Sequence, residues 1–154
     1  MSYQIHVENA CKQAFSIPTQ QQFQQWVELA LHPFRGHGAV NLRIVESDEM
    51  IQLNGNYRGK HKPTNVLAFA YHPEEQDHEA LLGDIAICAP VVLSEAQQQG
   101  KPAEHHWAHL VVHGTLHLLG FDHIKEEDAA QMEQQEIELL AQISIPNPYE
   151  TAAN

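Results

Sequence analysis

The sequence has few basic residues and few cysteines, and it lacks any long hydrophobic run. Eight Lys and Arg residues stand against 20 Asp and Glu residues, which gives a formal charge of −12. This balance argues against broad, charge-driven binding of nucleic acids, because such binding needs a net basic face. No apolar stretch is long enough to span a bilayer, so we expect no membrane partner.

The cysteines and the start of the chain bear on the cellular compartment. The first residues show no basic stretch followed by an apolar core, so no signal peptide is visible. Cys11 and Cys88 lie far apart and form no CxxC pair. Reduced thiols are then expected, and they predict a cytoplasmic protein.

The few basic residues are unevenly spread along the chain. Five of the eight lie between positions 35 and 62, namely Arg35, Arg43, Arg58, Lys60 and Lys62. The acidic residues concentrate at 74–79 and 126–138. A local basic patch on an acidic protein and a scatter of solvated charges are both compatible with this pattern, and charge alone does not decide between them.

Apolar periodicity predicts a single α+β domain with a mixed sheet of about four strands packed against helices. The domain is expected over 1–145, and a flexible tail over 146–154. The last helix, at about 126–142, should leave its Glu residues facing water. Strands are expected at 3–7, 40–45, 65–71 and 81–88; helices after Thr19, after Ser47, from Pro90 to near Gly100, and at 103–119; and loops at 56–65 and 72–79.

Histidine is abundant, and its distribution is the main functional signal. Six of the twelve histidines fall within nineteen residues: His105, His106, His109, His113, His117 and His123. Residues four apart on a helix share one face, so His113 and His117 can bind one ion. Gly120 breaks the helix and lets His123 return to the same ion.

Three histidines leave a fourth zinc position for water or substrate, which is typical of catalytic sites. The spacing resembles the metzincin protease pattern, but Gly114 stands where those enzymes carry the general base Glu. His109 lies roughly 12 Å along the helix from His117, too far to share an ion with it. Capping, packing or support of a ligand is therefore expected of His105, His106 and His109.

Two aspartates have open roles. Asp122 either orients a ligand, acts as a general base, caps the following helix, or faces solvent. Asp84 interrupts an apolar strand, and it either serves the site or satisfies backbone donors at a strand end; the second role is the default.

Three stretches in this order resemble the YbeY family of single-strand-specific endoribonucleases: NYRGKHKPTNVLAF, LLGDIAIC and HGTLHLLGFDH. The resemblance runs from about Leu42 to Leu140. The family commonly has Asp where this chain has Asn65, and Ser where it has Ala68. The resemblance implies an α+β fold with a metal at the mouth of a cleft. It also implies a cytoplasmic role in maturing the 3′ end of 16S rRNA and in late 30S quality control, alongside small-subunit proteins and a ribosome-assembly GTPase.

The site residues carried over by this resemblance are His113, His117 and His123 as ligands of one Zn²⁺, and Arg58 as the catalytic or RNA-binding arginine. Arg58 and the ligand His113 are thus the expected catalytic residues. Arg58 suits phosphate oxygens, and Lys60 and Lys62 either hold neighbouring phosphates or belong to a solvated loop. The alternatives are a metzincin-like zinc peptidase and a non-catalytic zinc-binding ribosome assembly factor.

Overall fold

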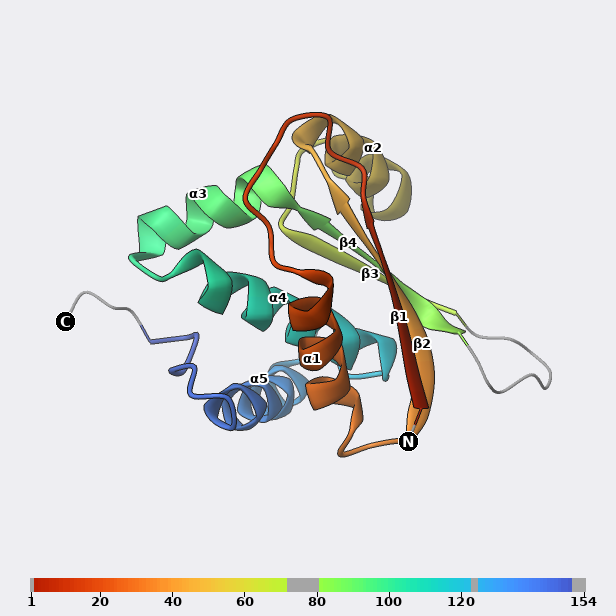
Figure 1. The fold of residues 1–154 in the computed structure, drawn as a ribbon, viewed down its shortest axis with the longest axis vertical. Coiled ribbons are helices and arrows are strands. Elements are labelled where there is room, and N and C mark those ends of the chain that lie inside the picture. The colour runs from red at the N-terminus through yellow and green to blue at the C-terminus, as the bar shows by residue number, and fades with distance from the viewer. Residues whose placement is uncertain (1, 72–80, 123–124, 151–154) are drawn as a thin grey trace.

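The computed structural model describes residues 2–71, 81–122 and 125–150. Its four strands are β1 (Ser2–Asn9), β2 (His37–Val45), β3 (Val66–Ala70) and β4 (Leu81–Cys88). They form one sheet in the order β1-β2-β4-β3 (Figure 1). β1, β2 and β4 run parallel, whereas β3 runs antiparallel to β4. The predicted α+β class and mixed four-stranded sheet are therefore confirmed.

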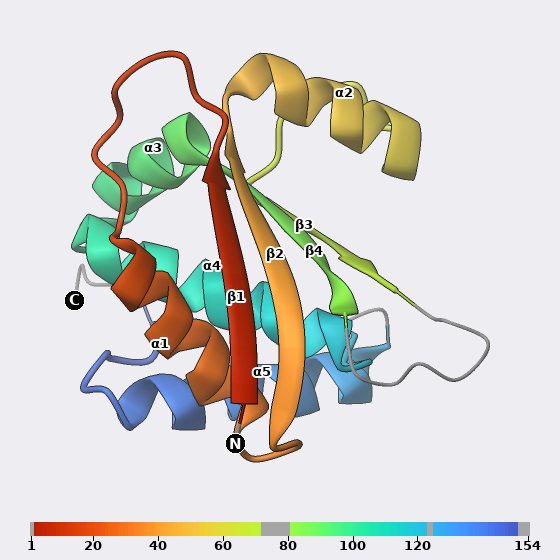
Figure 2. The same ribbon diagram turned by 45° about the vertical axis from the view of Figure 1, so that its right-hand side comes forward.

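Alternating side chains on β4 divide the core into two layers. Ile85 and Ile87 belong to the large core that α1 (Gln20–Leu31) and α4 (Ala103–Leu118) complete. Ala86 and Cys88 point to the other face and pack with Met50 of α2 (Ser47–Arg58). The helices therefore cover both faces of the sheet, with α2 on the face opposite to α1 and α4 (Figure 2).

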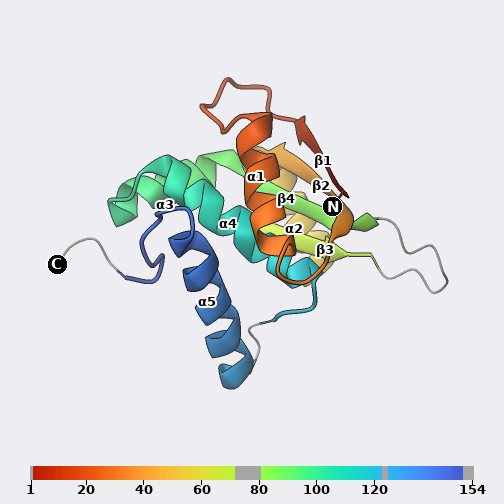
Figure 3. The same ribbon diagram turned by 60° about the horizontal axis from the view of Figure 1, so that its bottom comes forward.

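Helix α4 is the centre of the molecule. Trp107, Val111 and Leu116 are among its fully or almost fully buried side chains, as expected of a helix that is apolar on most sides. It contacts the sheet and also α1, α3 (Ala89–Gln99) and α5 (Glu126–Ala141), which lies beside it (Figure 3). Two histidines of α4, His109 and His113, thereby contact Glu136 of α5.

Two expectations about the helices α2 and α5 are wrong. The predicted loop 56–65 begins late, because α2 continues through Arg58 until Gly59 ends it with a left-handed φ of +72°. The expectation that the Glu residues of α5 face water fails at Glu136, whose side chain is 0% exposed. Its burial is explained by histidine partners on α4 that lie far away in the sequence.

The segment after α5 packs back onto the helices. Ile145 joins the large core, and Nζ of Lys101 donates a hydrogen bond of 2.5 Å to the carbonyl oxygen of Pro148. Of the predicted tail 146–154, residues up to Glu150 are described; the acidic connection 72–79 lies outside the described residues. Cys11 and Cys88 are free thiols. None of the helices in the described residues is long and apolar enough to cross a membrane.

Candidate metal centre and active site

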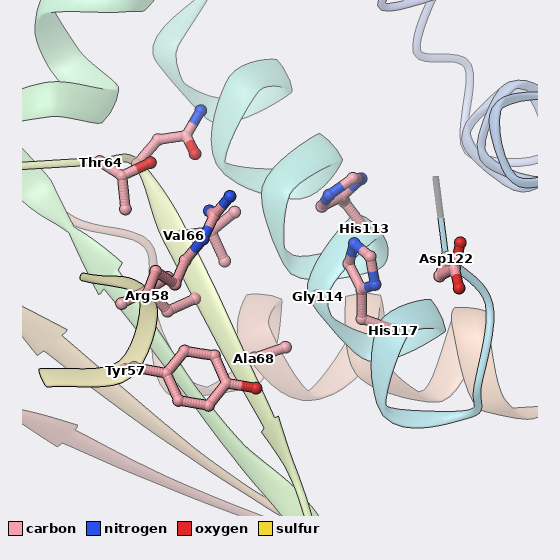
Figure 4. Close-up of a pocket in the computed structure, with 11 residues that line it drawn as sticks. Tyr57, Arg58, Thr64, Val66, Ala68, His113, Gly114, His117 and Asp122 are labelled. Carbon is pink, nitrogen blue, oxygen red and sulfur yellow. The ribbon is translucent and has the colours of Figure 1, made fainter. Parts of the chain in front are cut away.

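The histidine pair on α4 has the geometry that its spacing predicts. The rings of His113 and His117 lie with their centroids 4.6 Å apart and their planes at 80°. Both side chains line the same cavity, in which they project from successive turns of the helix (Figure 4). Two imidazoles in this arrangement are able to approach one ion.

The chain turns sharply after this pair. The backbone N–H of Gly120 donates to the carbonyl of His117, and that of Phe121 donates to the carbonyl of Leu116, a Schellman ending. Gly120 adopts a φ of +105°, which L side chains rarely reach, so the predicted glycine break is confirmed. The turn brings Asp122 to the cavity. His123 lies outside the described residues, so its role as a ligand stays a prediction.

The cavity has a volume of about 410 Å³ and joins α2, β3 and α4. Such a volume is typical of small-ligand and active sites. Arg58 enters from the end of α2 and faces the two histidines from the opposite side (Figure 4). The lining residues are Tyr57, Arg58, Thr64, Asn65, Val66, Leu67, Ala68, His113, Gly114, His117 and Asp122.

Gly114 lies where α4 passes closest to the sheet. A Cβ atom there would approach Cγ2 of Ile85 to 3.0 Å and Cγ2 of Val66 to 3.4 Å. A glutamate at position 114 would thus meet β3 and β4. The close packing gives a physical reason for the absence of the protease-type general base.

Tyr57 forms an exposed aromatic wall beside Arg58. Its side chain is 57% exposed, and its ring contacts that of Phe69 edge-on, with centroids 4.5 Å apart. An exposed aromatic ring next to a guanidinium group offers a surface for a flat, negatively charged ligand.

The five basic residues between 35 and 62 do not all gather at the cavity. Arg43 makes ion pairs of 2.7 Å with Glu8 and 2.6 Å with Glu49. Lys60 and Lys62 are exposed on the loop after α2, but they do not line the cavity. Within the described residues, Arg58 is therefore the basic side chain of this stretch that the fold brings to the histidines.

A cluster of polar side chains, formed by residues of α4 and α5, contacts His113. Among the described residues, His109, His113 and Glu136 have ligand atoms within 4.8 Å of one another and could hold a metal ion. The Oε2 atom of Glu136 is 2.8 Å from Nδ1 of His113, and its Oε1 atom is 2.7 Å from Nε2 of His109. Tyr149 adds a hydrogen bond of 2.5 Å from its hydroxyl to the same Oε1 atom.

These contacts and burial shift the pKa values of Glu136, His109 and Tyr149. Burial raises the pKa of Glu136, but hydrogen bonds from His109 and His113 outweigh burial and lower it to about 2. Burial lowers the pKa of His109, which therefore stays neutral near pH 7. Burial and the contact with Glu136 raise the pKa of Tyr149. An ionised carboxylate thus accepts from three donors.

Sequence reasoning missed Glu136, although a signal was present. Glu136 lies on the same helical stripe as the buried residues Met132, Leu139 and Leu140, at spacings of four, three and four residues. A carboxylate on an apolar stripe must find partners when it is buried. The stripe alone does not tell which partners these are.

His106 has a separate carboxylate partner. Its Nε2 atom lies 2.8 Å from Oε1 of Glu95, which also accepts a 3.0 Å hydrogen bond from Nδ2 of Asn65. The carboxylate of an aspartate at position 65 has no N–H group and could not donate this hydrogen bond to Glu95. The contact with Glu95 therefore gives a physical reason for Asn at position 65 in this chain. The expected packing or supporting roles of His106 and His109 agree with their contacts.

Asp122 and Asp84, whose roles the sequence left open, lie in different places: only Asp122 lines the cavity. Asp122 lines the cavity, whereas α5 begins after Lys125, so the helix-capping role for Asp122 is wrong. Asp84 lies within β4, where it accepts a 3.0 Å hydrogen bond from Nδ2 of Asn41, and it does not line the histidine cavity. Its expected place at a strand end is therefore wrong.

The fold and cavity define a single-domain α+β protein with a histidine-lined and arginine-lined cleft. A sequence model of the family described as Endoribonuclease YbeY matches residues 6–144, and the chain belongs to this family. Membership implies a hydrolase that cuts RNA internally. The fold is similar to the solution structure of TM1509 from Thermotoga maritima, with a TM-score of 0.59 and 24% identity over 97% of this chain and 99% of that one.

Proposed function

We propose that this protein is a zinc-dependent, single-strand-specific endoribonuclease of 16S rRNA 3′-end maturation and late 30S subunit quality control. Family membership supports RNA cleavage. The observation that carries the proposal is one cavity lined by Arg58 together with His113 and His117. Phosphodiester hydrolysis needs an activated water and a group that holds charge on the phosphate oxygens, and this cavity has residues suited to both tasks.

We propose His113, His117 and His123 as the ligands of one Zn²⁺. The close approach of the first two rings suits a single ion, since Zn–N bonds are roughly 2.0–2.1 Å long. These histidines would hold the zinc ion, which when bound would supply the acidity that activates a water molecule and the positive charge that polarises a phosphoryl oxygen. This chemistry requires no protein carboxylate as base, which is consistent with Gly114.

Arg58 supplies the second part of the mechanism. Its planar guanidinium binds two phosphate oxygens and stabilises the negative charge that grows in the transition state. The exposed ring of Tyr57 lies beside it and stacks with a base that is not paired, which favours single strands. Lys60 and Lys62 hold phosphates outside the cavity.

An acidic protein needs help to select one RNA. With a formal charge of −12, the chain as a whole does not attract RNA by charge alone. We therefore assign its rRNA specificity to partners in the cytoplasm, namely small-subunit proteins and a ribosome-assembly GTPase, as expected from the family.

The test is cleavage by the zinc-loaded protein of single-stranded RNA, the same RNA as a duplex, and casein. We expect only the single strand to be cut. His117→Ala should lose both zinc and activity, whereas the matched control His105→Ala, on the same helix but outside the cavity, should keep both.

Other outcomes would decide against the proposal. Casein hydrolysis without RNA cleavage favours a zinc peptidase. Unfolding of the domain on removal of zinc, with no cleavage of any substrate by the loaded protein, favours a structural metal and an assembly factor. Equal, near-zero zinc in wild type and His117→Ala under zinc-replete conditions contradicts the metal site itself.

A further inference from the structure

Glu136 is a fully buried carboxylate on α5 that contacts His113. His113 lines the cavity, whereas Glu136 does not. Moving a carboxylate out of water costs several kcal/mol, so such a group is retained only when donors surround it. Three donors do so here: His113, His109 and Tyr149, at 2.8, 2.7 and 2.5 Å. They come from α4 and from the segment after α5.

The contact fixes which nitrogen of His113 is protonated. A carboxylate only accepts hydrogen bonds, so Nδ1 of His113 must be the donor. In a neutral imidazole the other nitrogen, Nε2, then carries the lone pair, which is the atom a metal binds. The two ring nitrogens point in different directions, and the ring as a whole lines the cavity.

His109 has a different position relative to the same carboxylate. Its Nε2 atom donates to Glu136, and its Nδ1 atom is buried without a hydrogen-bond partner among the described residues. His109 does not line the cavity. Its contacts therefore hold the carboxylate in place, and they do not direct a ligand atom toward His117.

We infer that Glu136 is a positioning residue, which orients His113 so that Nε2 of that histidine binds the metal, while His109 and Tyr149 hold the carboxylate. The inference rests on the proposed function, because it assumes a metal at His113 and His117. It differs from direct ligation by His109, His113 and Glu136, the other arrangement that the distances allow. Carboxylates that support metal-binding histidines in this way typically contribute 10–100-fold in metal affinity.

The chain offers a matched control at another histidine of α4. Glu95 of α3 accepts from His106 at 2.8 Å, and neither of these two residues lines the cavity, so Glu95→Gln alters the same type of contact at a histidine that is not a predicted ligand. The zinc dissociation constant is measured by competition with a chromophoric chelator. We expect zinc binding 10–100-fold weaker in Glu136→Gln and changed less than about twofold in Glu95→Gln. Equal affinity in Glu136→Gln and wild type overturns the inference.

The absorption spectrum of bound Co²⁺ distinguishes a Glu136 that orients His113 from a Glu136 that binds the metal directly. With saturating Co²⁺, Glu136→Gln and His109→Ala should keep the wild-type d–d spectrum, whereas His117→Ala should change it. A changed spectrum in Glu136→Gln or His109→Ala, with none in His117→Ala, would make the buried carboxylate a direct ligand and overturn the inference.

A measurement on the wild-type chain covers the case in which Glu136→Gln does not fold. Nitrogen-15 NMR of the histidine rings should show His113 protonated at Nδ1 without metal, and zinc bound at Nε2 after loading. Protonation at Nε2, or zinc at Nδ1, contradicts the inference. Failure of the wild type to bind zinc at all would instead contradict the proposed function.

Discussion

A Cβ atom on Gly114 would come within 3.0 Å of Cγ2 of Ile85, so α4 and β4 pack together at the residue that follows the first cavity histidine. Both elements are fixed by the large core, which leaves little freedom for them to separate. This contact with β4, more than the helix propensity of the residue, limits the size of the side chain that fits at position 114.

Gly114→Glu should therefore destabilise the protein and create no peptidase. Overpacking a core typically costs 1–3 kcal/mol, partly offset by the better helix propensity of Glu. We expect a net loss of about 0.5–2.5 kcal/mol in urea unfolding, and no casein hydrolysis. Gly114→Ala, which adds the Cβ alone, should stay within about 1 kcal/mol of wild type. A fully stable, casein-cleaving Gly114→Glu would contradict this account.

Arg58→Ala should remove activity without removing zinc. Loss of a donor to transition-state charge typically costs about 10²–10³ in rate, and Arg58 is not among the predicted ligands. Cleavage rates on single-stranded RNA and zinc content by atomic absorption check both points. Arg35→Ala is the control, because Arg35 donates to the carbonyl of His37 and does not line the cavity. Full cleavage by Arg58→Ala would remove Arg58 from the mechanism.

Tyr57→Ala should weaken binding of single-stranded RNA. Stacking of a base on an aromatic ring contributes about 1–3 kcal/mol, so we expect a loss of roughly tenfold or more in affinity. Fluorescence anisotropy with labelled RNA measures it, and Tyr57→Phe should retain most of the affinity. Tyr71 is 54% exposed but does not line the cavity, so Tyr71→Ala should bind normally. An equal loss in Tyr71→Ala would point to a general surface effect.

Glu95→Gln should alter how stability depends on pH. Hydrogen bonds from His106, and then from Asn65, lower the pKa of Glu95 against the opposing effect of burial. A lowered folded-state pKa means that the stabilisation is complete above the unfolded-state value of about 4.3 and is lost as pH falls below it.

Urea unfolding of wild type and Glu95→Gln at pH 7, 5 and 3 checks this sign. We expect the variant to be about 1 kcal/mol less stable at pH 7, and the difference to shrink toward pH 3. A difference that grows as pH falls would contradict the assignment.

Local patterns predicted much of the candidate site. His113 and His117 are four residues apart on a strongly apolar helix, so their common face follows from helix geometry alone. Gly120 ends that helix because glycine tolerates the φ of +105° that the turn requires. The four strands were visible because apolar runs and alternation are local as well.

Contacts between distant segments could not be predicted in this way. Arg58 was expected in a loop, yet it ends α2, and only the packing of α2, β3 and α4 brings it to the histidine cavity. The Glu residues of α5 were expected to face water. Glu136 is buried because α5 packs against α4 and meets His113, 23 residues earlier in the chain.

By itself the sequence determined the helix that carries His113 and His117, the glycine turn after it, and the class of fold, because each depends on neighbours within a few residues. The tertiary structure alone decided that Glu136 contacts His113, that Glu95 joins Asn65 to His106, and that Arg58 faces the histidines. The reason is physical. A buried polar group forms hydrogen bonds with the partners that tertiary packing places next to it, and residue spacing along the sequence does not show which helices pack together.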